Sequence, residues 1–302
     1  LAFLARQFEI TLNAQQYSRT PASFNFYASP NVHGLSPYSG PVHGDTSIRV
    51  NGVGFAGGSD YRCQFGLLED ATAFQQVPAT FISFHLATCV APSIESGSAV
   101  DYRLRLTLNG QQFSPHDEPR ALYTYHGDSE IHEASPNSGP TSGGTLVTIT
   151  GVHLANGSDY RCRYAEAVVN ATYVESRDAV LCVAPTGAPG TASLEVSQNG
   201  QQYTDTGRVF SFYGAALAGD AAVEAHSSIA SLHPVGGPTD GSTLVEVTAD
   251  FLSGGSDYRC RFGPVEGIHA TYVNDKLIVC RSPPQNVSTQ NVSISLNAQP
   301  VH

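Results

Sequence analysis

The sequence has little positive charge. It carries 15 lysine and arginine residues against 26 aspartate and glutamate residues, a formal net charge of −11, and Lys276 is its only lysine. A nucleic-acid partner would need a basic face that neutralises phosphates, and an anionic membrane surface attracts basic segments. The composition therefore argues against both kinds of partner.

Long apolar runs are also missing. No run of the 302 residues is long enough to cross a bilayer, so we expect no membrane insertion in this segment. The start, LAFLARQFEITLNAQQY, has no basic region followed by an apolar core, as a signal peptide would. It also lacks an initiator Met, so we expect a mature fragment or part of a longer protein.

Catalytic motifs are absent as well. The sequence contains no GxSxG turn, no HExxH and no Walker loop. The glycine-rich stretch GPTSGG at 139–144 precedes an expected strand, so it offers no helix N-terminus to a phosphate. We expect no catalytic residue, no cofactor and no enzyme.

Three near-identical phrases repeat along the chain: GGSDYRCQFG at 57–66, NGSDYRCRYA at 156–165 and GGSDYRCRFG at 254–263. Their cysteines are 99 and then 98 residues apart. SPYSGP at 36–41, SPNSGP at 135–140 and HPVGGP at 233–238 recur in the same phase, as do NAQQ at 13–16, NGQQ at 109–112 and 199–202, and NAQ at 297–299. Such a period predicts tandem domains.

The predicted boundaries follow from this phase. Residues 1–28 are the C-terminal strands of a preceding repeat, 29–127 and 128–214 are complete repeats, 215–228 is a linker, and 229–302 is a repeat without its last strand. The favoured interpretation is a window on a longer array. The alternative is that the tail at 1–28 completes a neighbouring molecule's repeat by strand addition.

The patterning within each repeat is β. Leu104, Leu106 and Leu108 alternate with polar residues, a period of two. NG at 109–110 and 199–200 predicts a two-residue hairpin turn with positive φ at both positions. Repeats of about 98 residues have the size of one immunoglobulin-like sandwich.

Each repeat holds two cysteines. Six cysteines allow fifteen pairings, but the repeat favours pairing within units, as Cys63–Cys89, Cys162–Cys182 and Cys260–Cys280. Structural zinc sites use close CxxC pairs, and the sequence has none. Disulfides indicate an oxidising compartment, so we expect an extracellular or cell-surface protein.

The combination SPNSGPTSGGTLVTITGVHL, YRCRY, LCVAP and NGQQY resembles the IPT/TIG domain family, over nearly the whole chain and three times. The resemblance implies tandem immunoglobulin-like β-sandwiches. The paired cysteines are similar to those of the extracellular stalks of plexins, scatter-factor receptors and fibrocystin-type proteins. The family also includes intracellular DNA-binding modules, from which this acidic sequence departs.

Candidate modification and metal sites are few. Four Asn-x-Ser/Thr sequons predict N-linked glycans, with Asn170 and Asn291 preferred because both are expected to face outward, ahead of Asn156 and Asn286. Asp128, Glu130, His132 and Glu133 raise the question of a cation site at a domain junction. A solvated polar linker is the preferred interpretation, so no metal is predicted.

Three functions fit these observations. The first is a non-catalytic structural or adhesive rod of a cell-surface coat, filament or stalk, with protein–protein contacts to copies of itself or to other surface proteins. The alternative is the ligand-binding or spacer region of a plexin-like receptor ectodomain. The weakest is an accessory domain of a secreted carbohydrate-active enzyme, because such enzymes usually carry one such domain rather than a run.

Overall fold

The computed structural model describes residues 5–17, 22–68, 72–96, 99–116, 119–214, 229–250 and 252–299. The predicted linker at 215–228 lies outside these residues. The chain forms two compact units. Unit 1 comprises Leu1–Asp128 with the segments Asn156–Asp159 and Gln198–Gln202, and unit 2 comprises Ser129–Ala155, Tyr160–Ser197 and Tyr203–His302.

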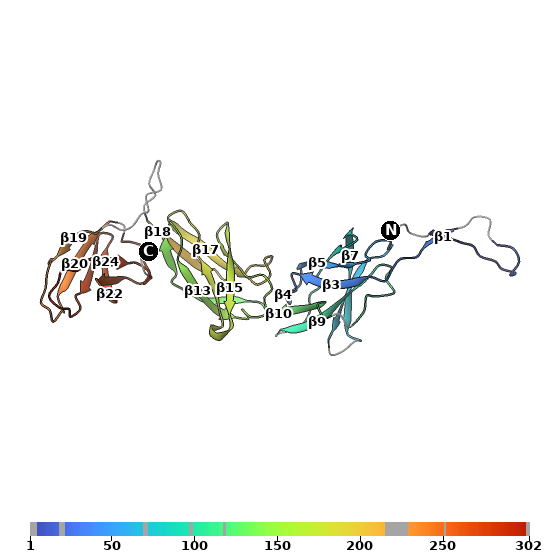
Figure 1. Ribbon diagram of the computed structural model, residues 1–302, viewed down its shortest axis with the longest axis horizontal. Coiled ribbons are helices and arrows are strands. Elements are labelled where there is room, and N and C mark those ends of the chain that lie inside the picture. The colour runs from blue at the N-terminus through green and yellow to red at the C-terminus, as the bar shows by residue number, and fades with distance from the viewer. Residues whose placement is uncertain are drawn as a thin grey trace. The chain divides into compact units, whose positions relative to one another are not determined.

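Unit 1 contains a two-stranded sheet and one sandwich (Figure 1). The small sheet pairs β1 (Ala5–Phe8) with β2 (Ala22–Asn25). The sandwich strands are β3 (Asn31–Ser36), β4 (Ser39–Pro41), β5 (Ser47–Val53), β6 (Arg62–Leu67), β7 (Phe74–Ser83), β8 (Leu86–Val90), β9 (Val100–Thr107) and β10 (Leu122–His126). They follow the order β3-β5-β8-β7-β6-β9-β10-β4, in which only the β10–β4 pair is parallel.

The long strand β7 belongs to both layers of this sandwich. Its first half pairs with β6, placing Val77 opposite Cys63, and its second half pairs with β8, placing Ala79 opposite Cys89. The leucines at 104, 106 and 108 are fully buried with Phe65 and Tyr123, as their period of two predicts. The core therefore lies between the β3-β5-β8 layer and the β6-β9-β10-β4 layer.

Unit 2 contains two further sandwiches. The first has β11 (Glu130–Ser135), β12 (Ser138–Pro140), β13 (Leu146–Val152), β14 (Arg161–Tyr164), β15 (Ala167–Val174), β16 (Ala179–Val183), β17 (Gly190–Ser197) and β18 (Val209–Tyr213), with a 3-10 turn at Glu175–Arg177. The second has β19 (Ile229–His233), β20 (Leu244–Ala249), β21 (Arg259–Phe262), β22 (Val265–Asn274), β23 (Leu277–Arg281) and β24 (Val292–Ser295). Figure 1 colours these two sandwiches green to yellow and orange to red.

The strand orders repeat the topology of unit 1. β11-β13-β16-β15-β14-β17-β18-β12 matches it strand for strand, and β19-β20-β23-β22-β21-β24 matches its first six strands. Among the described residues, the third sandwich has no counterparts of β10 and β4. The domain boundaries within the array stay a prediction.

One disulfide joins the two layers of each sandwich. Cys63 on β6 is bonded to Cys89 on β8, and the pairs Cys162–Cys182 and Cys260–Cys280 occupy the same strands of the other two. Their Cα atoms are 6.4, 6.3 and 6.4 Å apart. The expected class, all-β tandem immunoglobulin-like sandwiches with one disulfide each, is confirmed. No helix among the described residues has the length and apolarity to span a membrane.

The predicted two-residue hairpin turns at 109–110 and 199–200 are wrong. Gly110 and Gly200 have φ of 73° and 72°, but Asn109 and Asn199 are not among the residues with positive φ. Thr107 forms a bridge with Phe113, so residues 108–112 form a five-residue loop in unit 1. The asparagine side chain, rather than a tight turn, organises this loop.

Candidate functional site

The two phrases that recur most closely, GSDY and Asn-x-Gln, lie against each other in every repeat. The amides of Ser59 and Asp60 donate to Leu108 O at 2.9 and 3.0 Å. Parallel bridges then pair each phrase's aspartate with the loop asparagine, as Asp60–Asn109, Asp159–Asn199 and Asp257–Asn297. The two phrases are therefore one surface element, which explains why they recur together.

The asparagine side chain holds the Asn-x-Gln-Gln loop in a fixed turn. Asn109 Oδ1 accepts the amides of Gln111 and Gln112, both at 3.1 Å, and Asn109 Nδ2 donates to Gln112 Oε1 at 2.5 Å. Asn13 and Asn199 make the same three contacts within their own loops. This Asx geometry is local, so each loop has its shape before it contacts anything.

A tyrosine anchors the GSDY phrase to its own sandwich. Tyr61 Oη donates to Phe55 O at 2.8 Å and accepts the amide of Gly58 at 3.0 Å. Tyr258 repeats both contacts with Leu252 O and Gly255 N, at 2.7 and 3.1 Å. Each tyrosine also packs against the core of its own sandwich, so one side chain joins the turn to the core.

We call the serine of GSDY together with the asparagine and first glutamine of the loop the amide face. Its members are Ser59, Asn109 and Gln111 in the first repeat, Ser158, Asn199 and Gln201 in the second, and Ser256, Asn297 and Gln299 in the third. We call the residues that this face contacts, together with their equivalents in the third sandwich, the receiving edge. Its members are Ser39, Thr46 and Ser47, then Ser138, Thr145 and Leu146, then Gly236, Thr243 and Leu244.

Within unit 2, the amide face at 256–299 contacts the receiving edge at 138–146. Gln299 is bidentate to the backbone of Leu146: Nε2 donates to Leu146 O at 2.6 Å, and Oε1 accepts the Leu146 amide at 3.2 Å. Asn297 Nδ2 donates to Ser138 O at 3.4 Å and to Thr145 Oγ1 at 3.3 Å. The side chains of Ser138 and Ser256 are joined by an Oγ–Oγ hydrogen bond of 2.8 Å.

Unit 1 contains the same set of contacts. Gln201 is bidentate to the backbone of Ser47, with both distances 2.9 Å. Asn199 Nδ2 donates to Ser39 O at 3.4 Å and to Thr46 Oγ1 at 3.1 Å. The hydroxyls of Ser39 and Ser158 are 2.9 Å apart, and the second glutamine of the loop, at 202, adds contacts to Thr46 Oγ1 and Asp45 O.

Burial makes these polar contacts specific. Asn199 and Asn297 are 3% and 6% exposed, and Thr46 and Thr145 are 0% and 3% exposed. A buried amide or hydroxyl without a partner costs about 1–3 kcal/mol, so an apolar residue on either side would leave the other unsatisfied. None of the contacting groups is charged, so the contact depends on where the donors and acceptors lie and not on opposite charges.

Charge lies beside this surface rather than in it. Arg62 is paired with Asp60 through Nη2 and Oδ2 at 2.9 Å, and this hydrogen bond holds the pKa of the Asp60 carboxyl below its ordinary value. Arg259 and Asp257 form the equivalent pair, with Nε–Oδ1 at 2.7 Å, and their hydrogen bond raises the pKa of Arg259. Both charges are compensated within the GSDYR phrase itself.

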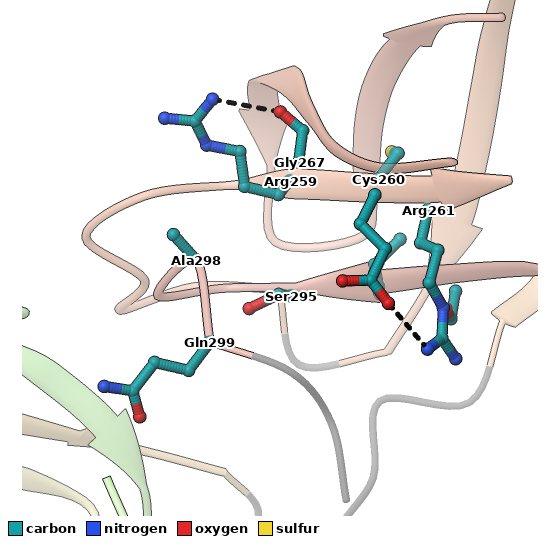
Figure 2. A pocket seen from close by; sticks show the side chains of 10 residues that line it. Arg259, Cys260, Arg261, Gly267, Ser295, Ala298 and Gln299 are labelled. Atoms are coloured by element: carbon teal, nitrogen blue, oxygen red, sulfur yellow. Dashed lines mark hydrogen bonds and ion pairs between the residues drawn. The ribbon is translucent and has the colours of Figure 1, made fainter. Parts of the chain in front are cut away.

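A shallow depression of about 260 Å³ borders the amide face in the third sandwich. Its lining comes from β21, β22, β24 and the loop after β24, and includes Arg259, Arg261, Glu266 and Gln299 (Figure 2). Arg261 Nη1 contacts Glu266 Oε1 at 3.4 Å, and Arg259 Nη1 donates to Gly267 O at 3.2 Å. Its charged side chains therefore contact one another and the backbone, while its Gln299 amide contacts Leu146.

The structure places all four predicted sequon asparagines, Asn156, Asn170, Asn286 and Asn291, at exposed positions. Asn156 has φ of 68°, in keeping with the glycines at that place in the other repeats. Asn170 lies on β15, where its Oδ1 accepts a hydrogen bond from Arg161. Glycosylation at these sites stays a prediction.

The candidate cation cluster does not come together. Asp128 Oδ1 contacts His43 Nδ1 at 3.0 Å, whereas Glu130, His132 and Glu133 lie on β11. Over the ranges that the structure describes, no three His, Cys, Asp or Glu side chains are grouped as a metal site.

The amide face and its receiving edge are functional residues that the sequence predictions missed. The signal was present, because asparagine and glutamine recur at 13–16, 109–112, 199–202 and 297–299. A hairpin turn needs no glutamines, so their recurrence pointed to a second role. The receiving edge consists of the serine or glycine before Gly-Pro, the threonine that follows and the residue after it. It lies over 150 residues from the loop asparagine that contacts it.

The IPT/TIG domain model matches residues 30–120, 129–212 and 227–301. The chain belongs to the IPT/TIG family. Each match covers one of the three sandwiches, so the IPT/TIG domains of this chain carry both the amide faces and the receiving edges.

The curated relatives include plexins. Mouse Plexin-A3 is 23% identical over 272 residues and mouse Plexin-A2 is 27% identical over 263 residues, which cover 84% and 85% of this chain. The chain spans only 13% of the length of either relative. A structure of the full extracellular region of Plexin A4, domains 1 to 10, aligns with 95% of this chain and 25% of that one, at 16% identity and a TM-score of 0.45.

The plexin-type relatives and the three disulfide-bonded domains indicate an extracellular or cell-surface protein. This agrees with the compartment expected from the cysteines. The family resemblance inferred from the sequence is confirmed.

Proposed function

We propose that this segment is a non-catalytic spacer of a plexin-like receptor ectodomain, in which IPT/TIG domains set the distance between other domains and provide surfaces for protein contacts. The observation that carries the proposal is the alignment with plexins over 84% of the chain, in IPT/TIG repeats. The alignment favours this alternative over the structural coat that stood first among the expectations.

The junction within unit 2 supports a spacer role. It joins two sandwiches through hydrogen bonds between fixed positions of each. One example is the bidentate contact of the Gln299 side chain with the backbone of Leu146. A spacer transmits distance only if its domains do not rotate freely about their linkers, and default interdomain interfaces permit such rotation. Repeated, position-specific polar contacts limit it.

The exposed sequons support glycosylation of the same surface. Asn170 is exposed on β15, and Asn291 is exposed directly before β24. N-linked glycans at these positions would cover the exposed surface around them and keep it soluble.

Electron microscopy of native material, combined with the intact mass of the protein that contains this chain, tests the receptor proposal. We expect single molecules, each attached to a membrane by one helix and released only by detergent. An ordered polymer or lattice that survives detergent extraction, with this segment repeated along it, would instead establish the structural coat.

A further inference from the structure

The amide face of the first sandwich is uncovered. Asn199 and Asn297, which contact a receiving edge, are almost fully buried. Asn109, the equivalent residue of the first sandwich, is half-buried. The exposure of Gln111 and Ser59 does not distinguish the faces, because Gln201 and Ser256 are exposed while they contact a receiving edge. The face has the same residues as its counterparts but covers none of the described receiving edges.

This face is already in its binding shape. The three Asx contacts of Asn109 reproduce those of Asn199 within a few tenths of an ångström. Gly110 has φ of 73° and Gly200 has φ of 72°. Little conformational entropy remains to be lost when the loop binds, and preorganisation of this kind favours association.

A receiving edge is uncovered too, in the third sandwich. Gly236 is exposed and Thr243 is half-buried, whereas their equivalents Ser39, Thr46, Ser138 and Thr145 are 0–3% exposed. Leu244 is exposed, as its covered equivalents Ser47 and Leu146 also are. Leu244 pairs with Arg281 at the place where Leu146 pairs with Val183. Thr243 O accepts the amide of Ser282 at 2.9 Å, as Thr145 O accepts the amide of Ala184 at 2.8 Å.

The exposed edge supplies the groups that the contact uses. An arriving asparagine requires a backbone carbonyl and a threonine hydroxyl, which Gly236 and Thr243 provide. An arriving glutamine requires the N–H and C=O of one backbone residue, which Leu244 provides. Glycine at position 236 removes only the serine–serine hydroxyl contact.

We propose that the amide face formed by Ser59, Asn109 and Gln111 binds the receiving edge of another IPT/TIG repeat of this kind. The partner is defined by its chemistry: a strand start that offers a free backbone amide and carbonyl beside a threonine hydroxyl, next to a Gly-Pro segment. The observation behind the proposal is continuity with the two contacts already formed inside units 1 and 2. The inference goes beyond the proposed function, because it holds for a receptor and for a coat alike.

A second copy of the chain provides the probe, because its edge at Gly236–Leu244 is uncovered. The hydroxyls of Ser158 and Ser256 lie 2.9 and 2.8 Å from those of Ser39 and Ser138, so cysteines at Ser59 and Gly236 should meet when two copies bind. A Cβ added at Gly236 meets no atom within 4 Å, so Gly236→Cys fits the fold. Disulfide capture retains a complex even when its affinity is low.

The experiment mixes Ser59→Cys and Gly236→Cys chains in a glutathione redox buffer and follows the covalent dimer by non-reducing gel and peptide mapping. We expect the dimer to form about tenfold faster than in a control mixture of Ser59→Cys with Thr289→Cys, whose cysteine is exposed elsewhere on the third sandwich. Adding the exposed substitution Gln111→Ala to the Ser59→Cys chain should slow capture about fivefold, because two hydrogen bonds are lost.

Equal rates in the two mixtures would overturn the proposal. So would a rate that Gln111→Ala leaves unchanged, because capture would then report only random collision of exposed thiols. A test based on this exposed side chain leaves each sandwich core intact, so neither outcome reflects a failure to fold. The outcome is independent of whether the native protein proves to be a receptor or a coat.

Discussion

Replacing Gln299 by alanine should loosen the junction within unit 2 at one identifiable amide. The side chain of Gln299 makes two hydrogen bonds to Leu146, at 2.6 and 3.2 Å, and one of them uses the Leu146 N–H. A hydrogen bond contributes about 0.5–1.5 kcal/mol net. Because Gln299 is half-exposed, the lower part of that range applies, so we expect a loss of about 1 kcal/mol for the pair.

Hydrogen exchange measures this loss directly. A change of 1.4 kcal/mol is a factor of ten in an equilibrium constant, so 1 kcal/mol should speed exchange of the Leu146 amide about fivefold. In unit 1, Gln201→Ala should do the same to the Ser47 amide, which donates to Gln201 Oε1.

Gln111→Ala is the matched control for both variants. Its side chain belongs to the same loop motif but contacts neither Leu146 nor Ser47, the residues that Gln299 and Gln201 bind. In dilute solution the substitution should therefore leave exchange at Leu146 and Ser47 unchanged. If Gln299→Ala leaves the exchange rate of the Leu146 amide equal to the wild-type rate within error, the reasoning is refuted. The contact would then not protect that amide.

Three further predictions concern single sandwiches. Replacing Cys162 and Cys182 by alanine should lower the free energy of unfolding by about 3 kcal/mol, since a 20-residue separation is opened, and an unchanged urea midpoint would contradict this. Tyr258→Phe removes two hydrogen bonds to the backbone and should cost about 1–3 kcal/mol in chemical denaturation, whereas Tyr272→Phe, whose hydroxyl contacts an exposed carboxylate, should cost less. Asn170→Gln should reduce the mass of the chain secreted from a eukaryotic cell by one glycan, and an unchanged mass would show that the site is not used.

The fold was predictable because its signals are local and occur three times. Alternation of Leu104, Leu106 and Leu108 fixes which side of a strand is buried. The period of 98–99 residues reduces the fifteen possible connectivities of six cysteines to one, and that one has the three observed disulfides. A single repeat would have left the strand count ambiguous. Repetition supplied information that a single-domain sequence lacks.

The contact surface was not predictable in the same way. Asn297 and Thr145 are 152 residues apart, and neither residue has a local reason to mark a contact. The loop sequence also led to a wrong turn prediction, because Asn-Gly is the preferred pair for a two-residue hairpin. In the structure, the Asn109 side chain instead accepts hydrogen bonds from the amides of Gln111 and Gln112. Local turn propensity was overridden by a side-chain hydrogen bond.

The central claim of this account is that the amide face of one IPT/TIG repeat contacts the receiving edge of another. The most direct test replaces Ser138 and Ser256, whose hydroxyls are 2.8 Å apart, by cysteine in the same chain. We predict a fourth disulfide that forms in a glutathione buffer and links the two peptides on proteolytic mapping, with Ser138→Cys and Thr289→Cys as the unlinked control. If both new thiols of the Ser138→Cys, Ser256→Cys chain remain free and react with a thiol reagent, the two surfaces do not meet and the account is contradicted.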